Sequence, residues 1–382
     1  MCRCLLRLIL VICLPLAAGA AFAQAAGEPQ RVLVGFTAPL SGPLQASATD
    51  ALNGARLALD RLNRQESRIA GVPVRFELLV KDDQASPERG VDIVREFAEA
   101  KVSAVLGPFN SGVALAVARL YNQNRLPMLT VASHPAVTRG DNDYVFRLAA
   151  HDGDMGRKLA QYAARTLKYR RVAIIQDGSG YGEGLIAEFQ AGAKQDGLQT
   201  AIQLQLAENA SDPEIRGALE LLRKATPDAL FFAGYVPQAA KLLKEMQAAG
   251  LALPMLAGDA ECSSEMFRLA GNYLANGVYC VQGGLWLTRV ADGAVFAAAY
   301  QSRYGRPPDV YAASFYDGLM LLARAMQTAG SSQPERFLPA LARSRYKGAT
   351  STYEFDARHD LKESTVTILR LKDGGLVPLA SF

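Results

Sequence analysis

Four segments of the chain place a polar or aromatic side chain directly after a run of apolar residues. These side chains are Ser111, Tyr181, Tyr235 and Asp259. A helix that starts near Ser111 offers free N–H groups and the positive end of a helix dipole, which suit a carboxylate. Asp259 suits an ammonium group, and a tyrosine offers a flat apolar face with one hydroxyl. Together these groups predict a binding site for an α-amino acid.

Each of these residues also has a purely structural interpretation. Ser111 is a good N-cap for the helix that follows it, and Asp259 could cap a helix over residues 262–271. Tyr181 could be a surface residue of a loop. A single position leaves the choice open, but the recurrence at several strand ends favours binding, because ligands of open parallel sheets bind at the carboxyl ends of the strands.

The glycine-rich stretch DGSGYGEG, residues 177–184, is a candidate for a dinucleotide-binding loop. That loop needs the pattern G-x-G-x-x-G, and neither choice of first glycine puts a glycine at the third position. Glu183 would also place a negative charge where the pyrophosphate should bind. The following strand, 198–206, ends without the acidic residue that binds the ribose. We therefore interpret the stretch as a tight turn that presents Tyr181 at a strand end.

Catalysis finds little support in the sequence. The three histidines, His134, His151 and His359, lie far apart and have no metal-ligand spacing. Ser179 is not part of a G-x-S-x-G motif. We expect no enzyme activity, no metal site and no cofactor.

Strands and helices alternate along the chain, and the alternation begins afresh after residue 148. The first series has strands at 31–40, 74–83, 103–108 and 126–133, and the second has strands at 171–177, 198–206, 228–235 and 253–259. Helices with apolar residues at helical spacing lie between them. This order predicts α/β architecture with two doubly wound, Rossmann-like parallel-sheet lobes. The end of the chain, 351–375, reads as a β-hairpin with an aspartate-rich turn.

The N-terminus has the layout of a secretory signal peptide over residues 1–25. Arg3 and Arg7 precede an apolar core, and small residues follow, with cleavage expected after Ala23 or Ala25. A membrane or lipid anchor at Cys13 is the alternative. We expect export to the periplasm.

Composition and cysteine use agree with an exported globular protein. The formal net charge is +4, and basic residues are scattered, which argues against nucleic-acid binding. Beyond the signal peptide only Cys262 and Cys280 remain. They could form a disulfide in an oxidising compartment or stay as two buried thiols, since sequence does not supply their distance.

Several motifs resemble the branched-chain amino acid binding proteins of bacterial ABC transporters, the leucine/isoleucine/valine-binding family of type I periplasmic binding fold. The motifs are "TAPLSGPLQ" with "NGARLALDRLN", "VKDDQASPERGVDIVREF", "VLGPFNSG", "MLTVAS", "QDGSGYGEGL" and "FFAGYVPQAAKLLKEMQAAGL". The resemblance covers the chain from about Val32 to Leu371. It implies two lobes joined by a three-strand hinge, with the ligand enclosed between them.

The family's ligand-binding positions can be carried over residue by residue. The resemblance implies that Ser111 binds the ligand carboxylate, assisted by the segment with Ala132 and His134. It implies aromatic contacts from Tyr181, Tyr235 and Tyr311, and an ammonium contact from Asp259. Expected lobes are 31–148 with 279–355, and 149–278 with 356–382. Expected partners are an amino acid, branched-chain or related hydrophobic or aromatic, and the permease and ATPase subunits of an importer, with the chain acting as a monomer.

Three departures from the family pattern affect these expectations. Ser47 stands where an aromatic residue often packs against the ligand side chain, and His134 replaces a small hydroxyl residue. Ala85 and Asn110 replace a first-lobe disulfide of many members. The pocket could therefore prefer an aromatic or polar ligand, and some relatives bind aromatic acids or amides. A soluble ligand sensor of the same fold is a further alternative to transport.

Overall fold

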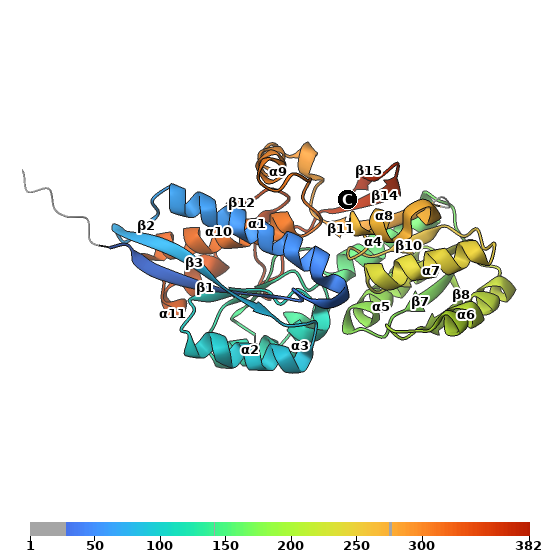
Figure 1. Cartoon of the computed structure of the whole chain (residues 1–382), viewed down its shortest axis with the longest axis horizontal. Helices are drawn as coiled ribbons and strands as arrows, with labels where there is room; N and C mark the ends of the chain where they lie inside the picture. Colours follow the sequence, from blue (N-terminus) through green and yellow to red (C-terminus); the bar gives the residue numbers. More distant parts are fainter. Residues whose placement is uncertain (1–27, 141, 275–276) are drawn as a thin grey trace, which may run out of the picture.

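The computed structural model describes residues 28–140, 142–274 and 277–382, and the statements below concern these residues. The predicted signal peptide, 1–25, lies outside the described residues. The chain forms two α/β lobes that lie side by side, each built around its own sheet (Figure 1). The predicted fold class is confirmed.

The first sheet has six strands in the order β2-β3-β1-β4-β5-β6, all parallel except the pair β2–β3. Its strands are β1 (Gln30–Ala38), β2 (Arg68–Ile69), β3 (Val72–Asp82), β4 (Ala104–Leu106), β5 (Met128–Thr130) and β6 (Val145–Arg147). Helices α1 (Gln45–Arg64) and α10 (Ala312–Ala329) cover one face, and α2 (Pro87–Glu99) and α3 (Ser111–Gln123) cover the other. Helices α9 (Ala291–Tyr304) and α11 (Pro334–Ala342) and the small pair β12 (Arg345–Lys347) and β13 (Thr352–Glu354) complete this lobe.

Residues of β1 alternate between the two faces of the first sheet, as expected for a strand. Val34 and Phe36 are fully buried in the core under α1 and α10. On the other face Gly35 leaves room for the ring of Phe97, because a Cβ at this position would lie only 3.0 Å from the ring. The strand is therefore covered on both sides, which explains its continuous apolar character.

The second sheet has seven strands in the order β15-β14-β11-β10-β9-β7-β8. Its strands are β7 (Arg171–Gln176), β8 (Gln199–Gln205), β9 (Ala229–Ala233), β10 (Met255–Ala257), β11 (Val278–Gly283), β14 (Val366–Lys372) and β15 (Gly375–Ser381). Helices α4 (Asp152–Arg165) and α5 (Gly180–Gln195) cover one face. Helices α6 (Asp212–Ala225), α7 (Val236–Ala248) and α8 (Glu265–Ala270) cover the other. Short 3-10 helices are η1 (Gly42–Leu44), η2 (Pro135–Val137), η3 (Gly271–Leu274) and η4 (Leu287–Arg289).

The chain passes between the two sheets three times, after β6, after β11 and before β14. The strand β11 pairs with β10 and β14 in the second sheet. The second sheet therefore extends to residue 283, beyond residue 278 where the sequence analysis ended this part of the second lobe. The physical reason is that Val278, Cys280 and Val281 are fully buried, so the backbone N–H and C=O groups of this segment need partners, which β10 and β14 supply.

The C-terminal hairpin predicted over 351–375 is wrong in its pairing. Strand β14 pairs with β15, and β13 pairs with β12. The turn between β14 and β15 consists of Asp373 and Gly374, both with positive φ, the conformation that a type I′ hairpin turn requires. The Asp-Gly pair was thus a stronger signal for a hairpin turn than the aspartate-rich segment before β14.

Candidate ligand-binding site

Helices α3 of the first lobe and α5 of the second lobe begin where the two lobes meet (Figure 1). The first turns of these two helices contact each other. A Cβ at Gly180 would lie 3.5 Å from the Cα of Gly112. We call this arrangement, with the lobes in contact, the closed arrangement.

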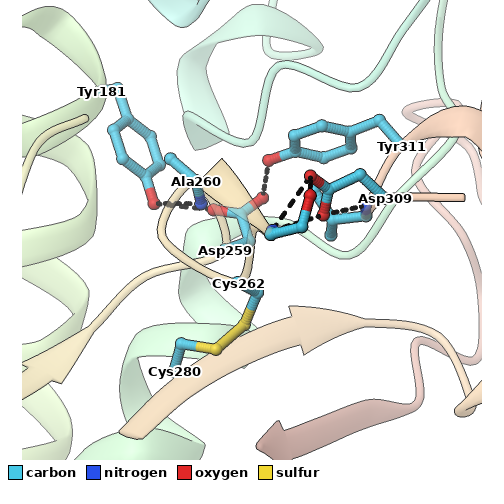
Figure 2. Close-up of a disulfide and its surroundings, with 9 residues drawn as sticks. Tyr181, Asp259, Ala260, Cys262, Cys280, Asp309 and Tyr311 are labelled. Atoms are coloured by element: carbon cyan, nitrogen blue, oxygen red, sulfur yellow. Dashed lines mark hydrogen bonds between the residues drawn. A yellow bond between two sulfur atoms is a disulfide. The ribbon is translucent and has the colours of Figure 1, made fainter. Parts of the chain in front are cut away.

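Asp259 is held from both lobes. It follows β10 and is 1% exposed. The hydroxyl of Tyr181, from α5 of the second lobe, donates a hydrogen bond of 2.6 Å to Oδ1. The hydroxyl of Tyr311, at the N-cap of α10 in the first lobe, donates to Oδ2 (Figure 2). The helix after Asp259 is capped at Ser264, so the interpretation of Asp259 as a helix cap is wrong.

Two further carboxyl groups lie buried close to Asp259. Burial raises the pKa of Asp259, and the hydrogen bonds from the two tyrosines oppose this shift. Burial and the charge of Asp259 both raise the pKa of Asp152 and of Glu261. Like charges this close disfavour the ionised forms, and a bound ammonium group would favour them.

Asp152 and Glu261 are residues that the sequence analysis missed. Both are fully buried, and none of their four carboxylate oxygens has a hydrogen-bond partner among the described residues. The hydroxyl of Ser133 opposes the raised pKa of Asp152 but lies outside regular hydrogen-bond geometry. A signal was available for Asp152, because it follows β6 at the same sheet edge as the other site residues.

Ser111 lies on the side of the site that suits an anion. It is the first residue of α3 and is 2% exposed. Asn110 is the N-cap, so the interpretation of Ser111 as the cap is wrong. The Ser111 Oγ accepts a hydrogen bond of 3.4 Å from the backbone N–H of His134. The hydroxyl and the first N–H groups of α3 are thus at the start of a helix, where a carboxylate is favoured.

Arg147 holds the segment that carries Ala132 and His134. Its guanidinium is fully buried and donates to the carbonyl oxygens of Ala132 and His134 and to Asp360. The bond to the His134 carbonyl is 3.1 Å and that to Asp360 is 2.7 Å. With these carbonyls bound, the N–H of His134 is directed to Ser111.

The side chain of His134 reaches the other lobe. Its Nδ1 accepts a hydrogen bond of 3.0 Å from the N–H of Ala136. Burial and the charge of Arg147 lower the pKa of His134, which favours the neutral ring. Across the interface the ring lies so close to Gly184 of α5 that a Cβ there would be 2.4 Å from Cδ2.

Aromatic rings surround the acidic groups. Tyr235 is the N-cap residue of α7, and its ring centroid is 5.3 Å from that of Tyr181. Burial raises the pKa of Tyr235, and the side chain of Asn110 in the first lobe opposes the shift. Phe109 packs edge-to-face against Tyr311 at 4.9 Å. Apolar faces and hydroxyl groups from both lobes are thus in place around Asp259.

Ser47 follows η1, the short helix that contacts α7 of the second lobe. It lies in the first turn of α1 and is partly exposed. In the described part of the chain it makes no hydrogen bond to another predicted site residue. The other seven, Ser111, Ala132, His134, Tyr181, Tyr235, Asp259 and Tyr311, lie on segments that meet between the lobes.

The two cysteines are joined in the structure. A disulfide links Cys262 to Cys280, with 5.5 Å between their Cα atoms. It attaches the loop that follows Asp259 to the strand β11 (Figure 2). Within the described ranges, no group of His, Cys, Asp and Glu is placed to hold a metal ion, and no helix is both long and apolar enough to cross a bilayer.

The family model described as "periplasmic binding protein" matches residues 31–375. The chain belongs to this family. A relative, the Leu/Ile/Val-binding protein homolog 1 of Brucella abortus, is 28% identical over 332 residues, 87% of this chain and 86% of that protein. Members of this family are binding proteins, which confirms the expectation that the chain is not an enzyme.

Two solved structures of the same fold differ in their ligands. The branched-chain amino acid transporter substrate binding protein of Streptococcus pneumoniae, in complex with isoleucine, has a TM-score of 0.82 at 24% identity, with 92% of this chain and 99% of that chain covered. A solute binding protein of an ABC transporter from R. palustris, in complex with benzoate, has a TM-score of 0.82 at 20% identity, with 92% and 96% covered. At these identities the similarity establishes the fold.

Proposed function

We propose that this chain is the periplasmic solute-binding component of an ABC importer and that it binds an amino acid with an apolar side chain between its lobes. The carboxylate of the ligand binds at Ser111 and the start of α3. Its ammonium group binds at Asp259, with Asp152 beside it. Tyr181, Tyr235 and Tyr311 contact the rest of the ligand.

The observation that carries this proposal is the pairing of a helix start in one lobe with buried carboxyl groups opposite. An α-amino acid has one negative and one positive end, and this site offers a partner for each. Asp152 and Asp259 are buried acids whose ionised forms need a cation. A carboxylic acid without an ammonium group would leave them without one.

Transport would follow from closure of the lobes on the ligand. Groups from both lobes contact the ligand in this proposal, so binding stabilises the closed arrangement. The permease and ATPase subunits of the importer are the proposed partners, and the permease distinguishes closed from open chains. The N-terminal segment 1–25 directs export to the periplasm in this proposal.

An aromatic acid is the second candidate ligand. Two observations favour it: the two tyrosine hydroxyls already bind Asp259, and a structural relative binds benzoate. Because both of its carboxylate oxygens already accept hydrogen bonds from tyrosine hydroxyls, Asp259 would tolerate a ligand with no cation. This candidate uses the same Ser111 side of the site.

A thermal-shift screen of the purified protein tests the proposal. Leucine, isoleucine, valine, phenylalanine and benzoate are compared at equal concentration, because a ligand that binds the native state raises the melting temperature. The proposal expects a clear increase with at least one amino acid. No increase with any amino acid, together with an increase with benzoate, would replace the first candidate by the second.

A further inference from the structure

The loop over residues 259–264 of the second lobe contacts the first lobe at two points. The first point is the hydrogen bond from Tyr311 to Asp259 described above. The second is Asp309, whose Oδ2 accepts hydrogen bonds from the hydroxyl groups of Ser263, at 2.7 Å, and Ser264, at 3.1 Å (Figure 2). The backbone N–H of Ser264 donates to the same oxygen at 3.1 Å. This second contact has no role in the proposed ligand site.

Asp309 is attached firmly to the first lobe. Its backbone N–H donates a hydrogen bond of 3.0 Å to Oδ2 of Asp50 in α1. Asp50 is itself bound by the hydroxyl of Tyr300, at 2.5 Å, and by Arg306, at 3.1 Å. Both Asp50 and Asp309 are buried. The carboxylate that meets the two serines is therefore part of a fixed network and not the end of a mobile side chain.

The two serines are attached equally firmly to the second lobe. The disulfide from Cys262, the residue before Ser263, ties the loop to Cys280 in β11. The Ser263 Oγ also accepts a hydrogen bond of 3.1 Å from the N–H of Glu265, the first residue of α8. Movement of one lobe away from the other would consequently break the contacts to Asp309.

We infer that Asp309 and the pair Ser263–Ser264 form an interlobe latch that stabilises the closed arrangement without contacting the ligand. Three donors converge on one carboxylate oxygen, and hydrogen bonds to a charged group are stronger than neutral ones. If more of the ligand-free chain is already closed, the ligand has to contribute less free energy to closure. A more stable closed arrangement also slows release of the ligand. The inference rests on the proposed function only in that the ligand binds between the lobes.

The test compares the parent chain with the double variant Ser263→Ala/Ser264→Ala. Release of leucine is measured by stopped-flow displacement, and the radius of gyration without ligand is measured by small-angle X-ray scattering. We expect the double variant to release leucine about tenfold faster, the scale of a lost charged hydrogen bond, and to have a larger radius of gyration. Asp309→Asn keeps the shape of the side chain but removes its charge. Its leucine release rate and radius of gyration should lie between those of the parent and those of the double variant.

Ser211→Ala is the matched control. Ser211 caps α6 and donates a hydrogen bond of 2.6 Å to Glu214, so its loss removes a serine–carboxylate contact inside one lobe. The control should lower the melting temperature and leave leucine release unchanged. Faster release in this control as well would overturn the latch, because the effect would then be general loosening.

The outcomes separate the latch from the proposed ligand. If leucine does not bind any of these proteins, the proposed ligand fails, and the radius of gyration alone decides on the latch. If the double variant equals the parent in radius of gyration and, where leucine binds, in its release rate, the latch is overturned while the proposed ligand stands.

Discussion

Replacement of Asp259 by asparagine tests the proposed ammonium contact. Asp259→Asn keeps the size of the side chain and can still hydrogen-bond to Tyr181 and Tyr311, but it removes the charge. Loss of one partner of a buried charge pair costs about 2–5 kcal/mol of binding free energy. We expect the lower half of this range, because Asp152, whose pKa the charge of Asp259 raises, remains as a second carboxylate beside the proposed ammonium position. The affinity for leucine should therefore fall by roughly 30–300-fold, the equivalent of about 2–3.5 kcal/mol.

Isothermal titration calorimetry at pH 7.5 measures this change. The same titration with the des-amino analogue of leucine is the internal control, since a ligand without an ammonium group should bind Asp259→Asn at least as well as it binds the parent. Ser111→Ala is the matched variant at the proposed carboxylate-binding position. It should weaken the binding of both ligands, because both carry a carboxylate. A parent-like affinity of Asp259→Asn for leucine would refute the proposed role of Asp259.

Three further variants test other parts of the account. Burial raises the pKa of Asp83 from 3.8 to about 6. Between these two pH values the unfolded chain has an ionised Asp83 and the folded chain a protonated one. The free energy of unfolding therefore falls by about 3 kcal/mol as the pH rises from below 3.8 through 6. Asp83→Asn should remove this loss in urea unfolding at pH 4 and pH 7; an unchanged pH dependence would contradict the shift. Replacing both Cys262 and Cys280 by alanine should lower the free energy of unfolding by about 3 kcal/mol, and an equal urea midpoint would count against the disulfide. Gly184→Ala should weaken leucine binding about tenfold, because the new Cβ would lie 2.4 Å from Cδ2 of His134 and 2.8 Å from Oδ2 of Asp152. A parent-like affinity in calorimetric titration would show that the site tolerates a methyl group at this position.

Much of the fold followed from local sequence patterns. Two series of buried strands separated by amphipathic helices leave few architectures, because a parallel sheet must be covered on both faces. The same rule placed Ser111, Tyr181, Tyr235 and Asp259 at one sheet edge in each lobe. These four residues are far apart in the sequence, and they could be grouped because the carboxyl ends of parallel strands lie at the same edge of a sheet.

The details that failed depend on contacts that no local pattern encodes. Asn110 and Ser111 are about equally good caps, so sequence could not decide which of them ends the loop before α3. Glu261 has the sequence context of an ordinary surface acid, yet it is fully buried, as is Asp152, and burial of a charged side chain is a tertiary property. Strand β14 pairs with β15 through the two-residue turn Asp373–Gly374. The sequence also offered the longer aspartate-rich segment before β14 as a turn, and the prediction chose that segment.

The contact of Asp309 with the loop after β10 was equally hidden from the sequence. Forty-six residues separate Asp309 from Ser263, and the two segments belong to different lobes. The disulfide between Cys262 and Cys280 could not be predicted from the sequence for the same reason, since the distance between two cysteines is a tertiary property.

The most direct test of the account is whether the ligand must carry both charges. Calorimetric titration of the parent chain with leucine, with its des-amino analogue and with benzoate compares ligands that differ in the ammonium group. We predict that leucine binds and that loss of the amino group weakens binding by at least about 30-fold, equal to roughly 2 kcal/mol. Equal or tighter binding of the des-amino analogue or of benzoate would contradict it.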